Sequence, residues 1–86
     1  MTWIIEFSEK AQKEIKFLDR QVQIRIRDVV KEKLATDPNR FLIQLVGKFT
    51  GLFKFRVGDY RLICEKHDSK FIVIIIKVKH RREAYK

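Results

Sequence analysis

Six side chains in the C-terminal half of the sequence have the chemistry needed to act together on a phosphodiester. Arginine binds phosphate through paired donors, lysine acts as a point charge, histidine titrates near neutral pH, and a base can stack on tyrosine. These residues are Lys54, Arg56, Arg61, His80, Arg81 and Tyr85. Such a set suits RNA cleavage without a metal, in which the 2′-hydroxyl attacks the adjacent phosphate and cations stabilise the extra charge.

Other catalytic signatures are missing from the sequence. The acidic residues are scattered and form no convincing pair, and there is no Gly-rich phosphate loop, Ser/His/Asp set or H-E-x-x-H motif. A single cysteine, Cys64, excludes an intrachain disulfide, and no Cys/His cluster supplies the ligands of a zinc site. We therefore expect neither a metal nor a cofactor.

Length and charge define the kind of molecule that carries these residues. A chain of 86 residues with 45% hydrophobic residues is expected to form one domain, residues 1–86. The formal net charge is +9, and residues 54–86 carry ten basic against four acidic side chains. This excess favours a polyanionic partner, with nucleic acid ahead of acidic protein and anionic membrane; the alternative is that the charge only promotes solubility.

The hydrophobic segments are short. The longest uninterrupted apolar run is Phe71–Ile76, which cannot span a bilayer, and the N-terminus shows no basic-then-apolar signal segment. We expect a cytoplasmic protein with no membrane partner.

The N-terminal half predicts a strand followed by two helices. Residues 2–7 alternate as a strand does, Ser8 is a candidate N-cap, and apolar spacing then predicts a helix to about Leu18. Asp19 is a second candidate cap, before a helix that must stop ahead of Asp37-Pro38. Phe17 and Phe71 are expected to lie in the core.

The second half changes to the two-residue period of strands. Strands are predicted at 41–46, 52–57, 60–66 and 71–78, and the last, apolar on both faces, is expected to be central. The fold class is therefore α+β, with an N-terminal strand and a helical hairpin packed on a mostly antiparallel β-sheet.

The segment Val57-Gly58-Asp59-Tyr60 predicts a two-residue type II′ hairpin, because glycine stands at the first central position. This turn places Arg56 opposite Arg61 and Lys54 opposite Ile63, so that three cations share one face. The alternative to a phosphate site is that these side chains extend into water or pair with Glu65. The basic residues that follow lie in the last strand and the tail: Lys77, Lys79, His80, Arg81 and Arg82.

Three segments resemble the RelE toxins of the RelE/ParE superfamily of toxin–antitoxin systems. They are Leu45-Val46-Gly47, the stretch from Gly51 to Ile63 that contains G-D-Y-R, and His80-Arg81-Arg82-Glu83-Ala84-Tyr85. The resemblance implies a small sheet with a helical hairpin on one side, and a ribosome-dependent endoribonuclease that cuts mRNA in the A site of the 70S ribosome. It also implies a RelB-like or similar antitoxin that neutralises the toxin, with operator DNA bound only through the toxin–antitoxin complex.

The resemblance also assigns residue roles by position. Lys54, Arg61, Arg81 and Tyr85 match catalytic residues of the family, and we expect substrate binding by Arg56, His80, Arg82 and Lys79. Arg56 is expected to stabilise charge, because arginine does not readily lose a proton. As acceptor of the 2′-hydroxyl proton, Lys54 and Tyr85 rank equally and ahead of His80.

Two other functions remain open. A ParE-like protein would inhibit DNA gyrase by binding and catalyse nothing; Lys54 and Tyr85 favour the nuclease over this alternative. An inactive toxin retained for antitoxin binding is the third possibility, because Lys79 stands where the family often has glycine.

Overall fold

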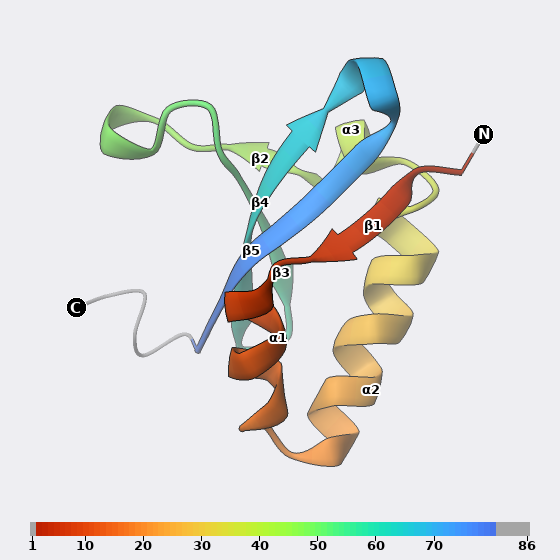
Figure 1. Ribbon diagram of the computed structural model, residues 1–86, viewed down its shortest axis with the longest axis vertical. Coiled ribbons are helices and arrows are strands. Elements are labelled where there is room, and N and C mark those ends of the chain that lie inside the picture. The colour runs from red at the N-terminus through yellow and green to blue at the C-terminus, as the bar shows by residue number, and fades with distance from the viewer. Residues whose placement is uncertain (1, 81–86) are drawn as a thin grey trace.

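The computed structural model describes residues 2–80, in which helices cover one face of a five-stranded sheet (Figure 1). The strand order is β1-β5-β4-β3-β2. Strand β1 pairs with β5 in parallel, and the other neighbours are antiparallel. The strands are β1 (Ile4–Phe7), β2 (Ile43–Gln44), β3 (Phe53–Val57), β4 (Tyr60–His67) and β5 (Ile72–His80). The predicted α+β class is confirmed, and β5 has a neighbour on each side as expected.

Two helices form the predicted hairpin, α1 (Glu9–Lys16) and α2 (Arg20–Val29). The Ser8 hydroxyl accepts a hydrogen bond from the Ala11 amide at 3.1 Å, which confirms Ser8 as the N-cap of α1. Asp19 precedes α2 but its side chain makes no capping hydrogen bond. A π-helical turn, Val30–Leu34, continues α2 and ends before Asp37-Pro38, as predicted.

The segment after this stop differs from the prediction. A short helix, α3 (Pro38–Phe41), begins at the proline, and the Asp37 carboxylate accepts from the Arg40 amide at 3.3 Å. Proline suits the first position of a helix because its fixed φ is already helical. The strand predicted at 41–46 is therefore reduced to the two residues of β2.

The β3–β4 hairpin has the predicted register throughout. Val57 lies opposite Tyr60, Arg56 opposite Arg61 and Lys54 opposite Ile63. Gly58 has a φ of 58°, and among the described non-glycine residues only Phe71 has a positive φ. A positive φ at the first central residue alone is the signature of the type II′ turn.

A β-bulge interrupts the pairing of β4 with β5. Cys64 lies opposite Ile75 but Ile63 lies opposite Lys77, so Ile76 is an extra residue on β5. The start of α1 stabilises the bulge, because the hydroxyl of its N-cap residue, Ser8, donates to the Ile76 carbonyl at 3.0 Å. Glu14 of α1 accepts from the Val78 amide at 2.9 Å. The bulge therefore lies where β1 has ended and α1 takes over as the neighbour of β5.

The core lies between the helices and the inner face of the sheet, which is the face toward α1 and α2. Leu62, Cys64, Val73 and Ile75 of this face have no exposed surface. The expectation that Phe17 lies in the core is wrong: it is 91% exposed, because it follows the last turn of α1 at the corner of the helical hairpin.

Phe71 is also less buried than expected. It is 42% exposed, in the turn between β4 and β5, with its ring edge-on to Trp3 at a centroid distance of 5.3 Å. No helix within residues 2–80 has the length and apolar character needed to cross a membrane.

Candidate active site

The outer face of the sheet, which points away from α1 and α2, carries a group of basic side chains. In the register of the three strands, Arg56 lies opposite Arg61 and Arg61 opposite Lys79. Two residues further along, Lys54 and Lys77 flank Ile63. We call these residues the basic face: Lys54, Arg56, Arg61, Lys77 and Lys79. Strands distant in sequence thus place cations on one surface.

The lysines of this group have no acidic partner among the described residues. Within residues 2–80, Lys54, Lys77 and Lys79 form no salt bridge, and the nearby Glu65 instead contacts His67, with 3.3 Å between Oε2 and Nε2. Glu65 therefore does not form a salt bridge with the cations of the hairpin, contrary to the alternative raised from the sequence. Arg56 is held by its own hairpin, since its Nε donates to the Gly58 carbonyl at 3.0 Å.

The concentration of like charge has a cost in stability. Like charges directly opposite on paired strands destabilise a sheet by a few tenths to about 1 kcal/mol. Arg56, Arg61 and Lys79 form one such row across three strands. An anionic ligand would relieve this repulsion, and a phosphate accepts well from the forked donors of arginine.

The bulge at Ile76 determines which side chains of β5 point to the outer face of the sheet. Val73 and Ile75 point inward, so strict alternation would turn Lys77 and Lys79 inward and His80 outward. The extra residue reverses the alternation, because a one-residue shift moves every following side chain to the other face. Lys77 is absent from the predicted site residues, and nothing in the apolar run before it signals the bulge that turns it toward the basic face.

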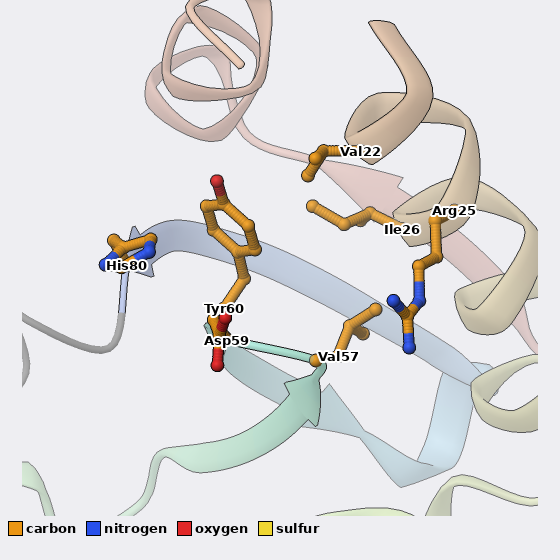
Figure 2. A pocket seen from close by; sticks show the side chains of 8 residues that line it. Val22, Arg25, Ile26, Val57, Asp59, Tyr60 and His80 are labelled. Carbon is orange, nitrogen blue, oxygen red and sulfur yellow. The ribbon is translucent and has the colours of Figure 1, made fainter. Parts of the chain in front are cut away.

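His80 accordingly lies on the inner side of the sheet. It is opposite Tyr60, and the two rings meet edge-on with a centroid distance of 5.1 Å. Figure 2 shows both rings beside a cavity that Val22, Arg25 and Ile26 of α2 also line; its volume is about 280 Å³. The structure thus brings Lys54, Arg56, Arg61 and Lys79 together but does not bring His80 to them.

The remaining predicted site residues, Arg81, Arg82 and Tyr85, lie outside the described residues. Cys64, the only thiol, is buried on the inner face, and burial raises its pKa to about 12. It therefore stays protonated at neutral pH and is no candidate nucleophile. In the described part of the chain, no group of three or more His, Cys, Asp or Glu side chains is placed to hold a metal ion.

Solved structures with a similar fold include toxins and toxin–antitoxin complexes. The RelBE2 toxin–antitoxin complex of Mycobacterium tuberculosis matches with a TM-score of 0.89 and 25% identity, over 94% of this chain and 93% of that one. The isolated Escherichia coli RelE toxin matches with a TM-score of 0.72 and 28% identity, over 96% and 90%. The archaeal RelE–RelB complex of Pyrococcus horikoshii matches with a TM-score of 0.69 and 27% identity, over 94% and 97%. The fold is therefore that of the RelE/ParE toxins.

The sequence comparisons agree with the fold. Residues 5–85 match the model of the ParE toxin of the type II toxin–antitoxin system parDE, and the chain belongs to this family. Toxin RelG of Mycobacterium tuberculosis is 26% identical over 86 residues, which cover 100% of this chain and 99% of that toxin. The resemblance to the RelE/ParE superfamily is confirmed, and the protein is a toxin of a type II toxin–antitoxin system.

Proposed function

We propose that this toxin is a ribosome-dependent endoribonuclease that cuts mRNA in the decoding A site and so inhibits translation. The observation that carries the proposal is the basic face, where three strands place five cations around one surface without acidic partners for its lysines among the described residues. An RNA backbone is the polyanion that such a surface suits. Similarity to the isolated Escherichia coli RelE toxin supports the same class of activity.

The chemistry follows from the charges. When the 2′-hydroxyl oxygen attacks the adjacent phosphorus, the phosphorane gains negative charge, and the bond to the leaving 5′-oxygen then breaks. Arg61 lies at the centre of its row, between Arg56 and Lys79, and is proposed to stabilise that charge. Removing one such donor costs about 3 to 4 kcal/mol in other enzymes. Arg81 and Tyr85 are proposed to act on the leaving group and the substrate base.

The acceptor of the 2′-hydroxyl proton is proposed to be Lys54 or Tyr85. Lys54 lies on the basic face, beside the position proposed for the scissile phosphate. His80 ranks third because it lies against Tyr60 on the other side of the sheet.

The proposed partners follow from the family. A cognate RelB-like antitoxin neutralises the toxin, as the complexes from Mycobacterium tuberculosis and Pyrococcus horikoshii suggest by analogy. Operator DNA is bound only through the toxin–antitoxin complex. The ribosome and mRNA are the targets, which places the toxin in the cytoplasm.

Primer-extension mapping of mRNA after induction tests the nuclease. We expect cuts at A-site positions only in messages that ribosomes are translating, and none in untranslated RNA. Arg61→Ala should reduce cutting by about 100-fold or more, whereas Lys70→Ala, which removes a cation from the exposed turn before β5, should leave it unchanged. A fully active Arg61→Ala/Lys54→Ala variant would exclude the proposal.

The ParE family match favours a second candidate, inhibition of DNA gyrase by binding alone. Induction should then stop DNA supercoiling before translation. Following both processes in the same culture distinguishes the two candidates, because the nuclease stops translation first.

A further inference from the structure

We propose that the basic face binds two consecutive phosphates of one RNA strand that runs along β4. We call this path along the basic face the phosphate track, and Glu65 and Glu6 form its boundary just beyond the bulge at Ile76. The inference rests on the RNA substrate of the proposed function. It adds a binding residue, Lys77, and a limit to the length of RNA that the sheet contacts.

The two rows of the basic face define the positions of the two phosphates. The first row has Arg56 and Lys79 on either side of Arg61, and the second has Lys54 and Lys77 on either side of Ile63. Adjacent strands are about 4.8 Å apart, so the flanking residues of each row lie about 10 Å apart across β4. Long basic side chains on β3 and β5 therefore form two walls, with β4 as the floor between them.

The rows are separated along β4 by two residues, about 6.8 Å in an antiparallel strand. This is close to the distance between successive phosphates in an extended single strand. An RNA backbone parallel to β4 therefore meets one row at each of two consecutive phosphates. In this arrangement Lys77 faces Lys54 across Ile63 and binds the same phosphate.

The charge of the outer face changes immediately beyond the bulge. The next row places Glu65 opposite Ile74 and Ile74 opposite Glu6, and the row after it consists of His67, Ile72 and Ile4. A third phosphate would meet two carboxylates and apolar side chains instead of cations. The same bulge that turns Lys77 outward thus also marks the boundary of the track.

Salt-dependent binding of short single-stranded RNA tests the track without requiring catalysis. For single strands, log K falls with log salt by about 0.7 per phosphate neutralised. The full-length toxin and a fluorescein-labelled, fully 2′-O-methylated hexanucleotide would be titrated by anisotropy at several salt concentrations. Lys77→Ala and Lys54→Ala should each reduce the slope by about 0.7, and the matched control Lys70→Ala should not change it.

The boundary is tested by extending the track. Glu65→Lys should steepen the slope by about 0.7, because it adds a phosphate-binding cation in the third row. Glu32→Lys changes the net charge equally but lies on the exposed π-helical turn after α2, so it should leave the slope unchanged. Equal slopes for Glu65→Lys and Glu32→Lys would overturn the boundary.

The outcomes separate this inference from the proposed function. If Lys77→Ala binds RNA with an unchanged slope while the wild-type toxin cuts mRNA in the A site, the track is wrong and the nuclease stands. If the slopes change as expected but no cut is found in translated mRNA, the track stands and the nuclease is wrong.

Discussion

Neighbouring residues of the same strand point to opposite faces of the sheet, and the two faces differ in character: one is apolar and buried, and the other is basic. On β4, Leu62 has no exposed surface and packs under the helices, whereas Arg61 and Ile63 belong to the outer face. No buried polar or charged side chain occurs in the described core, while the outer face gathers five cations. The buried apolar side chains are therefore concentrated on one face and the positive charge on the other, and single substitutions should separate their effects.

The largest expected effect is on the inner face. Leu62→Ala should lower the free energy of unfolding by about 2 to 5 kcal/mol, because it leaves a cavity in a fully buried site. Ile63→Ala, one residue away on the outer face, should cost much less. Urea denaturation of both variants measures the difference, and equal losses would contradict the separation of the faces.

The second-largest expected effect concerns the bulge at Ile76, which reverses the face of the sheet to which the following side chains of β5 point. Glu14→Ala removes the acceptor of the Val78 amide and should cost about 1 to 3 kcal/mol. Hydrogen exchange at Val78 should become faster, and RNA binding should weaken because Lys77 and Lys79 lose their fixed direction. Lys13→Ala, exposed on the same helix, is the control. Unchanged protection of Val78 would show that the bulge does not depend on α1.

A smaller effect of opposite sign is expected on the outer face. Arg56→Thr should raise the free energy of unfolding by a few tenths to about 1 kcal/mol, because it removes a like charge opposite Arg61. The same variant should bind RNA less tightly. Arg56→Lys keeps the charge and should leave stability nearly unchanged. A stability loss in Arg56→Thr, measured by urea denaturation, would mean that the lost hydrogen bond to the Gly58 carbonyl outweighs the repulsion.

The smallest expected signal is the reactivity of Cys64. With its pKa raised to about 12 by burial, the thiol should not react with iodoacetamide at pH 8 in the folded protein, although it should react in urea. Mass spectrometry counts the added groups. In Leu62→Ala the labelling should accelerate as the unfolded population rises. Rapid labelling of the native wild-type protein would show that the inner face opens without unfolding.

The hairpin was predictable from its sequence because local chemistry determines it. Gly58 at the first central position selects one turn, that turn selects one register, and the register separates Lys54, Arg56 and Arg61 from the buried side chains. The N-cap at Ser8 is local in the same way.

The β5 part of the site depends on contacts between distant residues, and the sequence does not reveal it. The bulge forms where β1 ends and Glu14 of α1 meets the Val78 amide, 64 residues away. Two-residue alternation therefore assigns Lys77 and His80 to the wrong faces. Phe17 shows a related limit: its apolar side chain favours burial, but the corner between α1 and α2 has nothing to cover it.

The parallel pairing of β1 with β5 affects how the molecule is made. The chain is synthesised from its N-terminus, so Ile4–Phe7 leave the ribosome long before their partners at Ile72–Ile75 exist. A growing chain that does not yet include β5 contains Arg56 and Arg61 of the hairpin but lacks Lys77 and Lys79. Its strand β1 has no strand to pair with. The complete basic face therefore forms only after β5 has been synthesised.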